Sequence, residues 1–157
     1  MMHDFRHKGV TNTFLVNTND ELSIIHNDSS VLERFHASES FKMLRAPKYN
    51  IICNMQEEDK KYFRQSVIDM ILATDLKQGP TYCTSFQQKM DNGCPFEDDE
   101  DIKLLLQLVL KCADVSHAAK PLRLHKLWTV LITEEFFRQV RHACTTPDMH
   151  RSSTMDH

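Results

Sequence analysis

The chain has 157 residues, of which 41% are apolar and 26% charged, and its formal net charge is −3. This length fits one domain or part of one. The lack of a basic excess argues against nucleic-acid binding, and no apolar run approaches the ~20 residues that a membrane span needs. Because the chain has only three glycines, a turn-rich β protein is disfavoured.

Local signals predict helices throughout the first half of the chain. A short helix is expected over residues 20–27, with Asn19 or Asp20 as its N-cap, and a longer one over 31–45. Residues 57–75 show the clearest amphipathic spacing, and their acidic first turn suits the positive end of the helix dipole. The apolar stripe of the helix over 57–75 consists of Phe63, Val67, Met70, Ile71 and Thr74.

The second half combines turn signals with two further helical patterns. Residues 76–101 contain Gly79-Pro80, Asn92-Gly93 and an acidic run, so they are predicted to form a solvated loop. Helices are expected over 102–115 and 121–140, and Pro121 suits the first turn of the second. The inward positions are predicted to be Leu105, Leu106, Val109, Leu110 and Ala113, and then Leu124, Leu127, Trp128, Leu131, Ile132 and Glu135.

No segment alternates with the period of a strand for long enough, so the predicted fold class is all-α, a multi-helix bundle. Residues 1–140 are assigned to one domain. Residues 141–157 lose the apolar periodicity and are predicted to be a disordered tail. Metal binding by His142, His150 and His157 is conceivable, but a terminal extension without a site is the simpler interpretation.

The cysteines and the N-terminus bear on the cellular compartment. Five cysteines, an odd number without CxxC spacing, indicate reduced thiols. No apolar signal-peptide core follows the first residues. The expected location is therefore the cytoplasm.

A first candidate site lies at the start of the chain. His3 and Asp4 place an imidazole beside a carboxylate, the pair of groups that a divalent cation accepts readily. His7 follows at i+4 and would share a face with His3 if the segment were helical. The simpler interpretation is that a histidine and an aspartate adjoin by chance.

Two further groups carry candidate chemistry. Asp114 ends an apolar helix, where a carboxylate opposes the negative end of the dipole, so it is either functional or a capped or ion-paired residue. Glu33 and His36 lie at i and i+3, and the simpler interpretation is an exposed local pair. Taken together with His3 and Asp4, these residues suggest a metal site built from distant helices, in which a water of lowered pKa attacks a phosphate.

Three blocks of the sequence carry a family resemblance. HDFRHKGVTNTFLVNTNDELSIIHNDSSVLERFH follows a pattern HD-x-x-H-x-G-x-x-N and then S-V-L-E-x-x-H. SVIDMILATDL follows V-I-x-M-V-L-A-T-D-M, and LKCADVSHAAKPLRLHKLWTVLITEEFFRQ follows C-A-D-x-S with a later E-E-F-F. In their order and spacing over residues 2–139, these blocks resemble the catalytic domain of class I 3′,5′-cyclic-nucleotide phosphodiesterases.

The resemblance implies an all-helical HD-type domain that holds two divalent cations, Zn²⁺ and Mg²⁺ or Mn²⁺. A hydroxide between the cations attacks the cyclic phosphate of cAMP or cGMP and yields the 5′-nucleotide. By resemblance, His3, Asp4 and Asp114 match metal ligands, and Asp4 would bridge both ions.

Further residues match catalytic positions of the family. His7 matches the second histidine of the first pattern, close to the water shell of the second ion. Glu33 matches an acid that hydrogen-bonds water in the pocket. Thr74, with Asp75, matches the A-T-D element beside the same water network.

Some family features are missing from these residues. The upstream H-N-x-x-H motif, which provides a metal ligand and the general acid, is absent, as is the C-terminal region that binds the purine. The chain is therefore expected to be a domain truncated at both ends, inactive or very weakly active, and poorly soluble alone. The alternative is a non-catalytic helical module that binds a partner or acts as a dominant-negative fragment, and homo- or hetero-dimers with other phosphodiesterase chains are expected. A different HD-type metal phosphohydrolase is disfavoured by the three ordered blocks.

Overall fold

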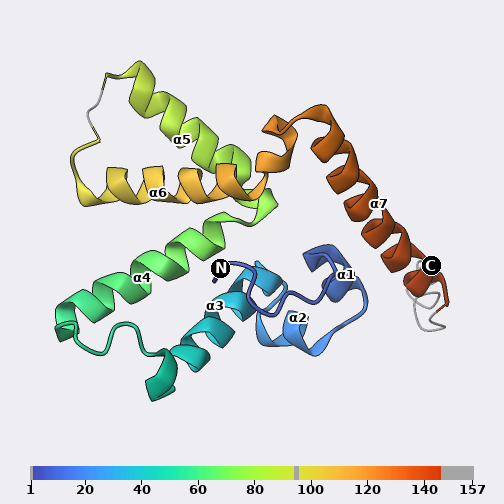
Figure 1. Ribbon diagram of the computed structural model, residues 1–157, viewed down its shortest axis with the longest axis horizontal. Helices are drawn as coiled ribbons and strands as arrows, with labels where there is room; N and C mark the ends of the chain where they lie inside the picture. The colour runs from blue at the N-terminus through green and yellow to red at the C-terminus, as the bar shows by residue number, and fades with distance from the viewer. Residues whose placement is uncertain (1, 94–95, 146–157) are drawn as a thin grey trace, which may run out of the picture. The chain divides into compact units, whose positions relative to one another are not determined.

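The computed structural model describes residues 2–93 and 96–145, which form helices and turns without any strand among them (Figure 1). The all-α prediction is confirmed. The α-helices are α1 (Asn12–Asn17), α2 (Glu21–Ile25), α3 (Val31–Leu44), α4 (Glu57–Ala73), α5 (Gly79–Asp91), α6 (Asp99–Asp114) and α7 (Leu122–Thr145). Short 3₁₀ helices lie at η1 (Pro47–Tyr49), η2 (Leu76–Gln78) and η3 (Ser116–Ala119).

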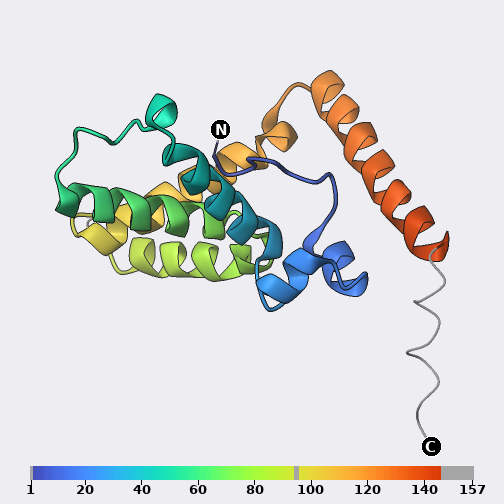
Figure 2. The same ribbon diagram turned by 90° about the horizontal axis from the view of Figure 1, so that it is seen from below.

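The helices divide into two compact units. The first unit combines the N-terminal segment up to Arg6 with Glu33–Ser116, and it holds α4, α5, α6 and most of α3. The second combines His7–Leu32 with the chain from His117 on, and it holds α1, α2 and α7. In the first unit, α6 packs against both α4 and α5, and Figure 2 shows these three helices beside one another.

The second unit has a small apolar core at the start of α3. Leu15, Val31 and Leu32 are buried there, and Leu22 of α2 packs against them. Asn12 fixes the same region, because its side-chain oxygen accepts a hydrogen bond of 2.8 Å from the Leu32 N–H. The core therefore joins the first three helices through residues close in sequence.

Helix starts follow the capping rules where a side chain is available. The Asp20 carboxylate accepts a hydrogen bond of 2.9 Å from the Leu22 N–H, which makes Asp20, and not Asn19, the N-cap of α2. Together with the Lys8 ammonium, this bond lowers the pKa of Asp20. Helix α1, which was not predicted, has Thr11 as its N-cap.

The predicted loop over 76–101 is wrong for most of its length. Helix α5 occupies Gly79–Asp91, with Pro80 in its first turn, where a proline sacrifices no intrahelical hydrogen bond. The acidic run starts a helix as well, because the Asp98 carboxylate caps α6 through the Asp101 N–H at 2.8 Å. A Gly-Pro pair and an acidic run therefore mark helix starts here.

The apolar faces of α6 and α7 differ from the prediction. In α6, Asp101 and Leu104 are buried, whereas Leu105, Leu106 and Val109 are exposed. Leucine and valine occupy so many consecutive positions of α6 that the sequence pattern does not define one face. In α7, the predicted inward residues Leu124, Leu127, Trp128, Leu131 and Ile132 are 41–59% exposed, whereas Gln139 is buried.

Helix α7 continues through Thr145, five residues into the predicted tail, and the rest of that tail lies outside the described residues. Among the described residues, no helix has the length and apolar character that crossing a membrane requires. Cys53, Cys83 and Cys112 are exposed free thiols.

Candidate metal centre

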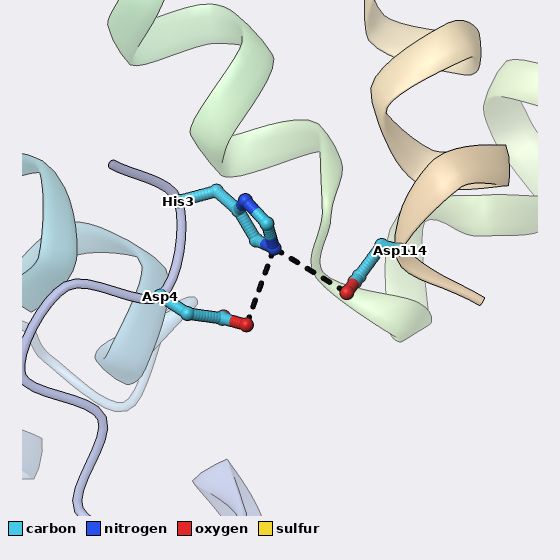
Figure 3. A group of neighbouring side chains, drawn as sticks. All are labelled: His3, Asp4 and Asp114. Carbon is cyan, nitrogen blue, oxygen red and sulfur yellow. Dashed lines mark ion pairs between the residues drawn. The ribbon is translucent and has the colours of Figure 1, made fainter. Parts of the chain in front are cut away.

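One imidazole and two carboxylates meet in the first unit. The Nε2 atom of His3 lies 3.2 Å from Oδ2 of Asp4 and 3.4 Å from Oδ1 of Asp114 (Figure 3). The possible ligand atoms of the three residues all lie within 4.8 Å of one another. The His3 ring is 4% exposed, while the two carboxylates are more accessible, so the group is open to solvent on its acidic side.

The segment that carries His3 and Asp4 is fastened to α3 on both sides of the pair. The Ser40 hydroxyl donates to the carbonyl oxygen of Met2 at 3.2 Å, and Nδ1 of His36 lies 2.8 Å from the carbonyl oxygen of Phe5. Positions 36 and 40 are one helical turn apart on the same face of α3. We call residues 2–6 the N-terminal strap.

A charged contact completes this attachment. The guanidinium of Arg6 pairs with the carboxylate of Glu39, which also accepts a hydrogen bond of 2.6 Å from Lys42. These bonds, first from Lys42 and then from Arg6, hold the pKa of Glu39 below its usual value. Glu39 therefore stays ionised in the folded chain at neutral pH, and its ion pair with Arg6 anchors the strap to α3.

The strap is not helical, so His3 and His7 do not share a helical face. Residues 3–6 form a turn, and Arg6 has a φ of 63°, which ends any right-handed helix there. His7 belongs to the second unit, where its Nδ1 accepts a hydrogen bond of 3.0 Å from the Gly9 N–H. Gly9 has a φ of 70°, a conformation that glycine adopts without strain.

Asp114 is the last residue of α6, as the sequence predicted to within one residue. Its carboxylate lies at the negative end of the helix dipole, which disfavours an anion, and a second carboxylate, that of Asp4, approaches the same Nε2 atom of His3. A cation between the two acids would offset both unfavourable terms. None of the described residues hydrogen-bonds the buried Nδ1 of His3.

This donor set fits a divalent metal ion. Zn²⁺ binds imidazole nitrogen and carboxylate oxygen, and its catalytic sites have three protein ligands that leave a further position open. Carboxylate oxygens also suit Mg²⁺ and Mn²⁺. The proximity of the two acids to the imidazole is the observation on which this fit rests.

The other predicted site residues have local partners. Thr74 is buried and donates to the Ile71 carbonyl at 2.7 Å at the end of α4, and Asp75 caps η2 by accepting from the Lys77 N–H at 2.9 Å. Glu33 lies in the first turn of α3 and is partly buried. The catalytic roles of Thr74, Glu33 and His7 remain predictions. The side chains of His142, His150 and His157 lie outside the described residues.

Sequence reasoning missed the attachment of the strap. His36 was interpreted as one half of an exposed pair with Glu33, but its ring is 2% exposed and contacts the Phe5 backbone. The available signal was the row of polar residues His36, Glu39 and Ser40 on one face of a helix, all of which are buried. The row indicated a polar contact, but no sequence feature identified the N-terminal strap as its partner.

The structure is a helical fold in which one imidazole and two carboxylates come together, a donor set that could hold a metal ion. The chain belongs to the 3′,5′-cyclic nucleotide phosphodiesterase family, whose model matches residues 1–157. The chain is 38% identical to the 3′,5′-cyclic-nucleotide phosphodiesterase regA of Dictyostelium discoideum, over 98% of this chain and 20% of that protein. It is 39% identical to the 3′,5′-cyclic-AMP phosphodiesterase 4C of Rattus norvegicus, over 88% of this chain and 27% of the relative.

Solved structures show the same fold. The crystal structure of the phosphodiesterase domain of the Salpingoeca rosetta rhodopsin phosphodiesterase matches with a TM-score of 0.87 and 29% sequence identity. The match covers 94% of this chain and 47% of that one. The chain thus spans about half of the solved domain, and 20% and 27% of the two relatives described above.

Proposed function

We propose that His3, Asp4 and Asp114 bind a divalent cation, and that the chain is the metal-binding part of a domain that hydrolyses 3′,5′-cyclic nucleotides to 5′-nucleotides. The observation that carries this proposal is the approach of Asp4 and Asp114 to within 3.4 Å of the same imidazole nitrogen, although they come from the two ends of the first unit. The family membership supports cyclic AMP or cyclic GMP as the substrate class.

Two cations, Zn²⁺ and Mg²⁺ or Mn²⁺, are proposed to be held here. The Asp4 side chain is 56% exposed, which leaves it accessible to a second ion on the solvent side. When bound, such cations polarise the phosphoryl oxygens and lower the pKa of a nearby water.

The remaining proposed roles belong to groups of this chain. Asp4 and Asp114 would supply the negative charge that holds the cations. Glu33, His7 and Thr74 are proposed to orient water and substrate through hydrogen bonds, as the matching positions of the family pattern imply. The 157 residues contain no H-N-x-x-H motif, so they bring no equivalent of the family's general acid. Loss of such an acid typically reduces the rate by about 10²–10⁴-fold, so turnover by these residues alone should be weak.

A titration of the purified chain with Co²⁺, a spectroscopic substitute for Zn²⁺, tests the proposal. We expect one saturable absorbance change in the wild type that Asp114→Asn and His3→Ala abolish. Lys103→Met, which removes an exposed ion pair with Glu100 on the same helix, is the matched control and should bind Co²⁺ normally. Equal Co²⁺ binding by the wild type and Asp114→Asn would refute the site. Cyclic AMP and cyclic GMP hydrolysis with added Mg²⁺ then tests the reaction.

A second candidate function is a helical module that associates with another phosphodiesterase chain as a homo- or hetero-dimer. The large exposed side chains of α7, such as Trp128 at 52% and Phe137 at 60%, favour it. Size-exclusion chromatography with light scattering separates the two functions, because a monomer with metal-dependent turnover would exclude an obligate partner-binding role.

We further propose a cytoplasmic location, which the exposed free thiols of Cys53, Cys83 and Cys112 support.

A further inference from the structure

The side chain of Lys111 ends against the carboxyl end of α4. Its ammonium donates hydrogen bonds to three successive carbonyl oxygens, those of Ala73 at 3.1 Å, Thr74 at 3.3 Å and Asp75 at 2.9 Å. An ammonium has three donors, so this contact uses all of them. Carbonyl groups at a helix C-terminus, as at Ala73 and Thr74, lack intrahelical partners and carry the negative end of the dipole, which makes a lysine favourable there. The Asp75 carbonyl also accepts a hydrogen bond of 3.1 Å from the Gln78 N–H.

A glycine makes room for this lysine. Gly79 starts α5 and is buried, and a Cβ atom placed on it would lie 2.9 Å from Cε of Lys111 and 3.5 Å from Nζ. The backbone of Gly79 has ordinary helical angles, φ −50° and ψ −50°. The position therefore needs glycine for space and not for conformation. Since the atom in the way is near the end of a flexible chain, a methyl group could be accepted by moving Lys111.

Lys111 and Asp114 lie in the same final turn of α6. The Val115 N–H donates to the carbonyl oxygen of Lys111 at 3.2 Å, which closes the turn that carries Asp114. One residue thus holds this turn twice, through its backbone to Val115 and through its side chain to the end of α4. The dipole of α6 disfavours a carboxylate at position 114, so the helix by itself does not favour the placement that Asp114 has beside His3.

We propose that Lys111 is a positioning residue that holds Asp114 opposite His3 by tying the last turn of α6 to the end of α4. The same three bonds fix the backbone of Thr74 and Asp75, so the end of α4 and the last turn of α6, which carries Asp114, keep fixed positions relative to each other. This role rests on the proposed function of His3, Asp4 and Asp114 as metal ligands. Lys111 itself contacts no ligand atom in the group.

The test measures the Co²⁺ affinity of the full chain by absorbance titration. Thermal unfolding of the metal-free protein is measured alongside it. Lys111→Met keeps the aliphatic stem and removes the donors, and it should weaken Co²⁺ binding by about 10–100-fold, as loss of groups that orient a ligand typically does. Lys111→Arg keeps the charge and donors and should restore most of the affinity. Gly79→Ala leaves the lysine present but displaced, and should weaken Co²⁺ binding in the same direction while the chain stays folded.

Lys103→Met again serves as the control and should leave the affinity unchanged. Wild-type Co²⁺ affinity in both Lys111→Met and Gly79→Ala would overturn the positioning role, while Asp114→Asn would still report on the metal site itself. If Asp114→Asn and the wild type bind Co²⁺ equally, the proposed site fails and the positioning role fails with it. If Lys111→Met does not fold, the two single variants Gly79→Ala and Lys111→Arg decide the question. Displacement of the Lys111 side chain in Gly79→Ala should lower the Co²⁺ affinity, and the arginine of Lys111→Arg should preserve it.

Discussion

Nδ1 of His36 donates a hydrogen bond to the carbonyl oxygen of Phe5 at 2.8 Å, which joins the middle of α3 to the residue that follows the His3–Asp4 pair. A carbonyl oxygen only accepts, so the proton of this bond belongs to the imidazole, and the bond fixes the Nδ1–H tautomer. The His36 ring is 2% exposed. The orientation of the N-terminal strap, and with it of His3, therefore depends on a buried donor in α3.

Replacing His36 should weaken the metal site without removing a ligand. His36→Leu leaves the Phe5 carbonyl without this donor, which costs about 1–3 kcal/mol if the group stays buried, and should lower Co²⁺ affinity by about 10–100-fold. His36→Asn, which keeps a donor close to the Nδ1 position, should lose less affinity. Co²⁺ titration and urea unfolding measure both effects, and equal affinity in His36→Leu and the wild type would show that the strap is held without this bond.

The charged anchor of the strap should make stability depend on pH through Glu39. Hydrogen bonds from Lys42 and Arg6 lower its folded pKa below the usual 4.5, so the ionised form stabilises the folded state. This contribution is complete above the unfolded pKa and is lost as the pH falls through the folded value. The stability difference between the wild type and Glu39→Gln should be constant at pH values well above 4.5 and should shrink as the pH falls through the lowered folded pKa of Glu39. A difference that persists unchanged in acid, measured by urea unfolding, would contradict the assignment.

Metal addition should stabilise the folded chain only when the donor set is intact. At a free Zn²⁺ concentration of about 100 times Kd, binding to the folded state contributes about 2.7 kcal/mol, which raises the Tm by roughly 5–10 °C for a chain of this size. EDTA should reverse the shift, and His3→Ala and Asp114→Asn should not show it. Calorimetry with and without Zn²⁺ measures it, and a full shift in Asp114→Asn would show that the ion binds elsewhere.

The second unit should depend on Gln139 of α7. Its side-chain oxygen accepts hydrogen bonds of 3.0 Å from both the backbone N–H and the hydroxyl of Thr11, the N-cap of α1. Gln139→Leu removes the acceptor from these donors and should destabilise this unit by about 1–3 kcal/mol. Gln139→Glu keeps the acceptor and should cost less. Hydrogen exchange of the Thr11 amide reports the effect locally, and unchanged protection in Gln139→Leu would exclude the role.

Particular residues show where sequence patterns were sufficient. Phe63, Val67 and Ile71 have the spacing of one face, and α4 forms there with Ile71 buried. Helix α2 starts at its acidic N-cap, Asp20. Such signals act within one turn of helix, so the sequence carries them directly.

Other residues show where patterns failed. Gly79-Pro80 indicated a turn, but it starts α5, because a proline in the first turn of a helix loses no intrahelical hydrogen bond. The buried face of α6 contains Asp101, which pairs with Lys89 of α5, and not the predicted row of leucines. For Asp101, the partner that decides which face of α6 is buried lies on a different helix.

The sequence by itself determined the family, the all-helical class and the identity of His3, Asp4 and Asp114 as candidate ligands, because motif residues and helical periodicity are local properties of the chain. Only the tertiary structure decided that Nε2 of His3 lies within 3.4 Å of both acids, that α3 fastens the strap on both sides of the pair, and that Lys111 ties α6 to α4. The physical reason is that convergence of groups distant in sequence depends on packing and on buried hydrogen bonds between helices, which no local spacing encodes.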